Sequence, residues 1–519
     1  MNTRPLFESL ESRLLMSGTE VFTDVDNDVA TLQLIGPGHM VIVEDANGLA
    51  AIELTGTKGT SSLQIAVKKK VGGDGLLKVG MINILGTGGL KNLGASDVDL
   101  TGGGITSDGR VAFISVNTVG VDSGIRIAQN VPPLTRARTT YIVADYILNG
   151  AVIDSGEGIS NLESVRIGDA TISAPSIGNL LSKGYCLADI TTDSIWTARV
   201  GGATDGAWTI DGDGTTSSIQ LGHTDDTWSI DAPDVTVSSL RVNGAMNYES
   251  IDLLAIGTLQ VFGDMVGTGD LTLRYQPLPQ IGGQVRRALP ALRSASVDGA
   301  ITGTWAMDDA GPISAGSASE WIVTAGDVRS IHIANNAMVS WTGRSIGTLY
   351  VGGSLGLSMI ELSAPTSAKT YALKSAVIEG EMFAYIIADG NIGSVTAGKF
   401  YFATIFAGTV PDLITMDAST DAHHYFTNDQ TRIEYVRSTG MEGETNFVEG
   451  LDVLAPNVGT VRLWNLTPTN QGVDGIGFLT YGSIMLQQGG SLQHPGQSAS
   501  WPTTWPNNLA NFQIVDMTW

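Results

Sequence analysis

Ile346-Gly-Thr-Leu-Tyr-Val-Gly-Gly353 is one copy of a short phrase that recurs along the chain about every twenty residues. The phrase has the pattern apolar-Gly-Ser/Thr-apolar-x-apolar. Other clear copies begin at Ile256 and Ile392, and looser copies begin at Ile177 and Val458. A fixed period of this length is typical of a solenoid, in which each coil buries its apolar side chains against its neighbours.

The spacing of the copies predicts the kind of coil. Successive copies begin at 216 and 237, which are 21 residues apart, and at 328 and 346, which are 18 apart. Helical repeats need roughly 33 to 45 residues per unit. The fourth and sixth residues of the phrase are apolar and the fifth is usually polar, as in a strand with one buried face. Glycines at both ends of the strand are expected to mark turns. We therefore expect an all-β chain that forms a parallel β-helix solenoid, right-handed by default, with coils about 4.8 Å apart.

The composition narrows the class of partner. The 519 residues carry a formal net charge of -24, from 28 Lys+Arg and 52 Asp+Glu. Because nucleic acid requires a basic surface, no nucleic-acid partner is expected, and divalent cations or cationic surfaces are favoured. The sequence has no apolar run of about eighteen residues, so no transmembrane segment is expected. The single cysteine, Cys186, is expected to fill space in a coil.

The two ends of the chain differ from the repeats. The apolar residues of the first segment follow helical spacing and predict a short amphipathic helix that caps the open end of the solenoid: Leu6, Phe7, Leu10, Leu14 and Leu15. We expect this cap to span residues 1–20 and the β-helix solenoid to span 21–475, with a Pro- and Arg-rich loop inserted near 275–293. Residues 476–519 are expected to form a C-terminal cap or tail.

Residues 7–17, FESLESRLLMS, resemble the LEPR-XLL segment found at the N-termini of many large surface or secreted proteins of planctomycetes. Leu10, Glu11, Arg13 and Leu15 match that segment, whereas Ser12 stands in place of its proline, and Met16 replaces its last leucine. The Gly-rich repeats downstream also resemble those of such proteins. The resemblance implies sorting or export, and therefore a location at the cell surface or outside the cell.

An acidic stretch supplies the first candidate metal site. Residues 205–234 contain seven aspartates and no Lys or Arg. Asp211 and Asp231 are one repeat period apart and are expected to occupy the same place in consecutive coils, with Asp213 nearby. Like charges stacked at coil spacing repel each other, and carboxylate oxygens suit Ca²⁺. The alternative is a solvated acidic face.

Asp24, Asp26 and Asp28 form a second candidate metal site with alternating spacing, like the start of an EF-hand loop. Val29 and Ile35 occupy the positions where an EF-hand needs Gly and Glu, so an EF-hand is not expected. Monodentate binding of Ca²⁺ at a turn is left as the alternative to a plain polar turn. His423 and His424, beside Asp421, would not chelate one metal well, because adjacent strand residues point to opposite faces. They are expected to lie in a polar turn.

Tryptophans recur at the coil period. Trp208 and Trp228 are one repeat period apart, as are Trp321 and Trp341. This spacing favours an aromatic ladder in the core of the solenoid. The alternative is an exposed ladder that grips sugar rings.

These features favour a non-enzymatic, elongated cell-surface or secreted protein with a structural or adhesive role. Its expected partners are other surface proteins or extracellular polysaccharide, and end-to-end or lateral self-association is open to it. The alternative is a Ca²⁺-dependent polysaccharide lyase or glycoside hydrolase. Its candidate residues are Asp211, Asp213, Asp231, Arg286, Arg287 and Arg293.

Overall fold

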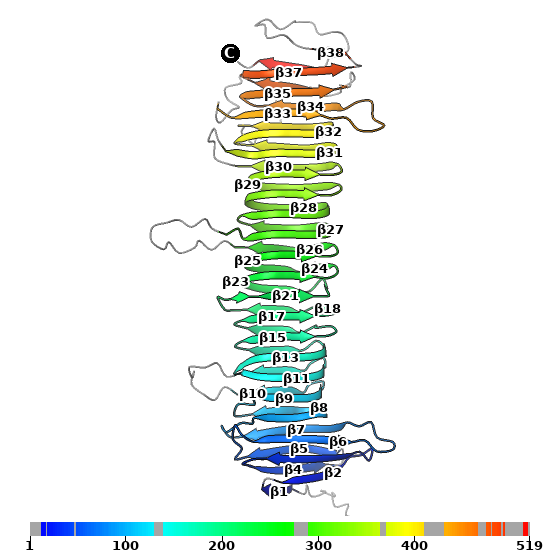
Figure 1. Cartoon of the computed structure of the whole chain (residues 1–519), viewed down its shortest axis with the longest axis vertical. Helices are drawn as coiled ribbons and strands as arrows, with labels where there is room; N and C mark the ends of the chain where they lie inside the picture. The colour runs from blue at the N-terminus through cyan, green and yellow to red at the C-terminus, as the bar shows by residue number, and fades with distance from the viewer. Residues whose placement is uncertain are drawn as a thin grey trace, which may run out of the picture. The chain divides into compact units, whose positions relative to one another are not determined.

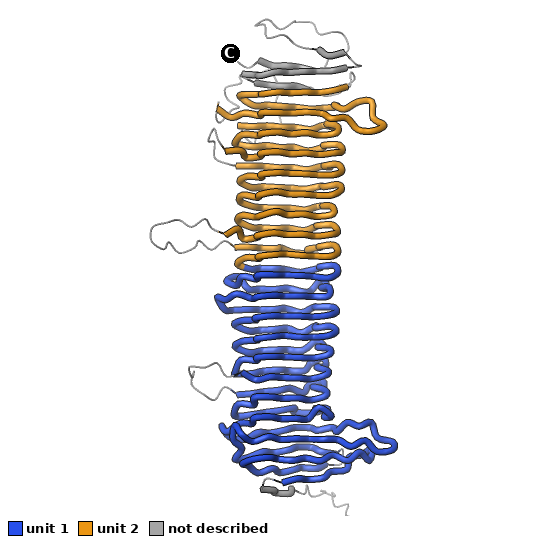
Figure 2. The backbone as a smooth tube through the Cα atoms, in the orientation of Figure 1, with its two compact units in different colours: residues 1–253 blue, residues 254–519 orange. Residues whose placement is uncertain are grey.

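The computed structural model describes residues 12–16, 18–45, 48–128, 139–274, 289–363, 370–408, 430–465, 474–478, 480–488, 491–493 and 512–516. Every regular element in these ranges is a β-strand, and most strands pair in parallel, which confirms the predicted all-β parallel β-helix (Figure 1). Within the same ranges no helix has the length and hydrophobicity needed to cross a membrane. The chain divides into two compact units, residues 1–253 and 254–519, which are taken one at a time (Figure 2).

The first unit contains the following strands: β1 (Ser12–Met16), β2 (Thr19–Thr23), β3 (Val29–Ile35), β4 (His39–Asp45), β5 (Gly48–Thr55), β6 (Ser62–Lys68), β7 (Leu77–Leu85), β8 (Asn92–Ser107), β9 (Phe113–Val119), β10 (Gly124–Ile127), β11 (Thr139–Ile147), β12 (Val152–Ser155), β13 (Gly158–Ile167), β14 (Thr171–Ala174), β15 (Ile177–Ser182), β16 (Asp189–Thr192), β17 (Ile195–Val200), β18 (Ala203–Thr204), β19 (Ala207–Ile210), β20 (Thr215–Thr216), β21 (Ser218–Leu221), β22 (His223–Thr224), β23 (Ser229–Val242) and β24 (Met246–Tyr248).

The limit between the units falls inside β25 (Ser250–Val261). The second unit continues with β26 (Met265–Leu273), β27 (Leu292–Met307), β28 (Ala310–Ile333), β29 (Ala337–Val351), β30 (Leu355–Leu362), β31 (Tyr371–Ala388), β32 (Asn391–Ala407), β33 (Arg432–Ser438), β34 (Val448–Leu454), β35 (Asn457–Trp464), β36 (Asp474–Phe478), β37 (Thr480–Gln488), β38 (Ser491–Gln493) and β39 (Phe512–Asp516).

The start of the first unit is built from antiparallel strands. β2 pairs with β3 and β3 with β6, while β1 pairs with β4 and β4 with β5. From there the pairing turns parallel, because β5 pairs with β7 and β6 with β8. These antiparallel strands form the beginning of the unit, before the first parallel coils (Figure 1).

The prediction of an N-terminal helix is wrong for residues 12–16, the described part of that segment, because Ser12–Met16 is strand β1. The backbone N–H and C=O groups along the edge of β4 need partners, and only another extended segment supplies them in register. β1 does so from Ser12, opposite Val43, to Met16, opposite His39. Pairing at a sheet edge therefore overrides the helical spacing of the leucines. Residues 1–11 of the predicted cap lie outside the described residues.

Parallel coils then follow with a period close to the predicted one. Ile159 pairs with Ile177 and Ile177 with Ile195, so one phrase position is stacked in three consecutive coils. In the second unit Val328 pairs with Ile346, which are the first residues of two successive copies of the phrase. The repeated phrase therefore marks one coil.

Each coil of the second unit has two faces that pack against each other. One face, the phrase face, carries the repeated phrase, and the other, the tryptophan face, carries residues such as those of 337–343. Leu349 and Val351, the fourth and sixth residues of their phrase, are buried, while Tyr350 between them faces outward and is half-buried. A small apolar cavity of about 10 Å³ lies between the two faces, with Leu349 and Trp341 among its lining residues. The predicted alternation is confirmed.

The glycine at the second position of the phrase has a different role from the predicted turn. Gly347 lies inside β29, where a Cβ atom would stand 2.3 Å from the backbone oxygen of Arg329 in the preceding coil. Gly393 meets the oxygen of Lys374 at the same distance. The residue is therefore glycine because two coils approach too closely there for a side chain.

Three tryptophans of the second unit form a buried ladder, as expected for Trp321 and Trp341. Trp305, Trp321 and Trp341 are at most 1 % exposed, and successive rings meet edge to face, with centroids 5.2 and 5.8 Å apart. They alternate between two neighbouring columns of the core. Trp305 and Trp341 both lie opposite Val323, whereas Trp321 lies opposite Val339. Each large ring thus lies beside a smaller side chain in its own column, which lets the coils keep their spacing.

Candidate functional site

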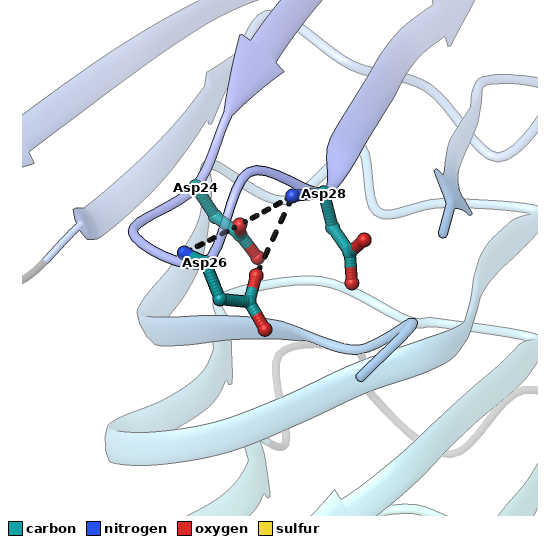
Figure 3. Close-up of side chains that lie close together, drawn as sticks. All are labelled: Asp24, Asp26 and Asp28. Atoms are coloured by element: carbon teal, nitrogen blue, oxygen red, sulfur yellow. Dashed lines mark hydrogen bonds between the residues drawn. The ribbon is translucent and has the colours of Figure 1, made fainter. Parts of the chain in front are cut away.

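The tight turn between β2 and β3 brings Asp24, Asp26 and Asp28 together. One carboxylate oxygen of each residue lies within 4.8 Å of the others (Figure 3). The turn is closed by the Asp24 carboxylate, which accepts hydrogen bonds from the backbone N–H groups of Asp26 at 3.2 Å and Asp28 at 2.9 Å. Asn27 has a positive φ of 73°, which Asn tolerates better than most residues. The alternating spacing seen in the sequence is therefore a folded-back acidic turn.

Asp28 fastens this turn to the segment that follows β6. Its side chain is fully buried, and its two carboxylate oxygens accept the backbone N–H groups of Lys70 at 2.6 Å and Gly75 at 2.5 Å. The Cβ of any other residue at Gly73 would overlap the Asp28 carboxylate, at 1.9 Å from Oδ1. A carboxylate can be buried when hydrogen bonds from the protein replace those it made to water. Asp28 therefore holds the turn and the segment after β6 together.

Asp24 and Asp26 compete for one proton. Desolvation by burial, followed by a hydrogen bond with Asp26, raises the pKa of Asp24 to about 6. The same hydrogen bond lowers the pKa of Asp26. Near neutral pH both groups are ionised and close together, so a cation would relieve their repulsion. The oxygen-only donor set suits Ca²⁺, although the Asp28 oxygens are already used by N–H groups. Calcium at this turn remains a prediction.

The other predicted aspartates do not stack. The register places Asp231 opposite Thr209, two positions before Asp211. This coil is therefore longer by two positions than the sequence spacing indicated. Asp211, Asp213 and Asp231 are all exposed, and they do not appear among the described residues as a group that could hold one ion. The predicted cause of calcium binding there, two directly opposed carboxylates, is absent.

Closely placed carboxylates from consecutive coils occur instead at Asp309 and Asp327, in the second unit. The backbone N–H of Asp327 donates to Oδ1 of Asp309 at 2.8 Å. Arg344 bridges the two carboxylates, with one nitrogen 3.0 Å from Asp309 and 2.6 Å from Asp327. At this pair of carboxylates a protein cation supplies the kind of neutralisation that was predicted for a metal at Asp211 and Asp231. The spacing of the two aspartates equals that of the phrase copies at 328 and 346, so it could have identified them in the sequence.

A column of hydroxyl groups runs along the phrase face of the second unit. It comes from the third phrase position, where Ser330 pairs with Thr348, Thr348 with Ser375, and Ser375 with Ser394. Ser394 donates to the hydroxyl of Ser375 at 3.1 Å. These side chains face outward and are exposed or half-buried. The surface therefore repeats the same chemistry once per coil.

An apolar hollow of about 380 Å³ lies on the outer side of the tryptophan face. Ile322 and Leu357, which line it, are 49 % and 62 % exposed, and Met338, Met359 and Tyr385 complete its apolar wall. The backbone register shifts beside the hollow in consecutive coils, between Ala318 and Trp321 and again between Ala337 and Ser340. At such a bulge, a side chain that a regular strand would bury can point outward.

Comparison with known proteins finds no match for this chain among protein families, curated proteins or solved structures. Function is therefore inferred from the surfaces of the two units. Asp421, His423 and His424, and the candidate arginines Arg286 and Arg287, lie outside the described residues. The remaining candidate of that loop, Arg293, is exposed in β27, at the second position of a phrase.

Proposed function

We propose that this protein is a non-enzymatic scaffold of the cell surface or extracellular space that adheres to polysaccharide or to other surface proteins. The observation that carries the proposal is the hydroxyl column of the phrase face. Thr348, Ser375 and Ser394 contribute nothing to the apolar core, and the coil register places them one above another. A surface that repeats at coil spacing is suited to a partner that also repeats.

Two further features support adhesion. Ile322 and Leu357 in the apolar hollow are exposed to water. Exposed apolar patches commonly mark sites of contact with other molecules. The resemblance of residues 7–17 to a segment of surface and secreted proteins supports a location outside the cytoplasm. Since the outward columns lie on regular strands, they are held rigidly, which reduces the entropy lost when a partner binds.

The test incubates the full chain with a panel of acidic and neutral polysaccharides, with and without Ca²⁺. The bound fraction is measured together with the release of reducing ends and the absorbance of unsaturated uronates. We expect retention of at least one polysaccharide without release of product, because a scaffold holds its partner unchanged. The surface fraction of the source cells is probed for the protein in parallel.

Product release would contradict the proposal. Release that depends on Ca²⁺ would support the alternative of a polysaccharide lyase or glycoside hydrolase, and Asp24→Asn would then test the acidic turn. Protein confined to the cytoplasm, together with no retention on the panel or on surface-protein extracts, would also contradict it.

A further inference from the structure

The second position of the phrase alternates between glycine and a cation along the phrase face of the second unit. The residues at this position, in coil order, are Gly257, Arg293, Gly311, Arg329, Gly347, Lys374 and Gly393, and the next coil ends the series with Glu434. The register confirms the order, since Ile256 pairs with Leu292, Leu292 with Ala310, and Ile346 with Leu373. The phrase face therefore has a repeat of two coils over this stretch, which the single phrase conceals.

The fold explains the glycines of this series. A Cβ atom at Gly311 would lie 2.0 Å from the backbone oxygen of Arg293, and at Gly347 it would lie 2.3 Å from that of Arg329. A side chain is therefore excluded at these two positions, and likewise at Gly393, where the Cβ would lie 2.3 Å from the oxygen of Lys374. Gly311 and Gly347 leave the space between successive cations free of side chains.

The fold does not explain the cations. Arg293, Arg329 and Lys374 are exposed, and within the described residues none of them makes an ion pair or a side-chain hydrogen bond. Nearby cations do have such partners, as in the pairing of Arg344 with two aspartates and of Lys399 with Glu381. An unpaired row at one register position is thus a separate feature of the surface.

Each cation is followed by a serine: Ser294 after Arg293, Ser330 after Arg329, and Ser375 after Lys374. Ser330 and Ser375 belong to the hydroxyl column, whereas Pro312, opposite Ser294, separates Ser294 from it. All three serines are half-buried. Each cation is therefore adjacent in sequence to a serine hydroxyl, three times in succession. At two coils per step, neighbouring cations are roughly 10 Å apart along the stack.

We propose that this cation row, Arg293, Arg329 and Lys374, binds a linear acidic polysaccharide with one carboxylate per disaccharide. Such a polymer places a charge at every second sugar ring, which matches a cation at every second coil. The uncharged sugars between the carboxylates lie over the glycine coils, where no side chain obstructs them, and their hydroxyls hydrogen-bond to the serine hydroxyls. The inference rests on the proposed function and names the class of polymer that this face recognises.

The row suits such a polymer better than nucleic acid. Phosphates of one DNA strand follow each other at about 3.4 Å along the axis, so most would find no cation on the row. The net charge of -24 also opposes a polymer of high charge density. Two carboxylates close in sequence to the row, Asp309 and Asp327, are bridged by Arg344, which reduces local repulsion.

The experiment measures binding of hyaluronan fragments to the full chain at physiological ionic strength. The row variant carries Arg293→Gln, Arg329→Gln and Lys374→Gln. The control variant carries Lys78→Gln, Lys183→Gln and Arg199→Gln, exposed cations of the first unit whose loss changes the net charge equally. We expect the dissociation constant to rise at least tenfold in the row variant and less than twofold in the control, because each lost surface pair weakens binding severalfold. Unchanged unfolding midpoints would show that both variants fold.

Three results would overturn the proposal that the cation row binds an acidic polysaccharide. They are an equal loss of hyaluronan affinity in the two variants, no binding of hyaluronan by the unmodified chain, or equally tight binding of a single-stranded DNA oligonucleotide. These outcomes are separable from a failure of the proposed function. Retention of neutral polysaccharide or surface protein without product release would still support the scaffold. Product release would contradict the scaffold whether or not the row binds hyaluronan.

Discussion

Glycine at the second phrase position is determined by the neighbouring coil. The sequence showed the glycine clearly but not its reason, since a turn and a close approach of two strands both favour the residue that lacks a Cβ. Gly347 is not among the glycines with a positive φ, so its conformation is open to other residues. Only the oxygen of Arg329, 2.3 Å from the Cβ position, excludes them.

Gly347→Ala is expected to lower the free energy of unfolding by about 2 kcal/mol, because the coils must separate to admit the methyl group. Chemical denaturation followed by circular dichroism measures the change. Gly356→Ala in the same unit is the matched control, since its Cβ would lie 3.5 Å from the nearest atom, the oxygen of Ala337. Equal effects of the two substitutions would contradict the close-approach explanation.

Asp24 is expected to make stability depend on pH. Its pKa rises from 3.8 in an ordinary carboxyl to about 6 in the folded chain, mainly through burial. Between these values the folded state holds a proton that the unfolded state has lost, so the contribution of Asp24 to stability falls as pH rises from about 4 to about 6. Asp24→Asn keeps an oxygen for the N–H groups of Asp26 and Asp28 and removes this proton.

The measurement compares unfolding midpoints of the unmodified chain and Asp24→Asn at several pH values. The difference between them should change through the window from about 4 to about 6 and level off above it. Parallel curves for the two proteins would contradict the shared proton. Calcium titrations at pH 5 and pH 7 extend the test, since a cation at this turn competes with the proton and should bind better at the higher pH.

At the scale of elements, the sequence predicted which residues of the phrase face inward and which face outward. It did not predict which residues of consecutive coils lie opposite each other. Trp208 and Trp228 are one sequence period apart, but the register pairs Trp208 with Ile230. A shift of two positions keeps a side chain on the same face of a strand and moves it to the next column. The predicted burial of Trp208 and Trp228 is therefore confirmed, whereas the predicted direct stacking of Asp211 on Asp231 is wrong.

The N-terminal strands could not be recognised from local spacing. The leucines between residues 6 and 15 fit a helix, and the requirement for a strand comes from the edge of β4, far along the sequence. The turn of Asp24, Asp26 and Asp28 was found from its spacing. Its attachment to Lys70 and Gly75 was not, because it joins segments that are distant in the sequence.

At the scale of the whole chain, the acidic composition and the surface chemistry point in different directions. The net charge of -24 describes the chain as a whole, yet one face of the second unit carries three cations in register that have no ion-pair partner among the described residues. Composition argued against nucleic acid as a partner, and only the register of the coils brings Arg293, Arg329 and Lys374 into one row. The proposed scaffold and its proposed ligand both depend on that register.

The register is tested most directly by a pair of engineered cysteines, Ser330→Cys and Thr348→Cys. These residues are direct partners in neighbouring coils, and the expected Cα separation of about 4.8 Å permits a disulfide. The native Cys186 does not compete, because burial raises the pKa of its thiol to about 12. Ser330→Cys with Tyr350→Cys, two positions out of register and about 8 Å apart, is the control. Mild oxidation followed by peptide mass spectrometry should find the first disulfide and not the second, whereas the reverse, or equal yields, would contradict the coil that underlies this account.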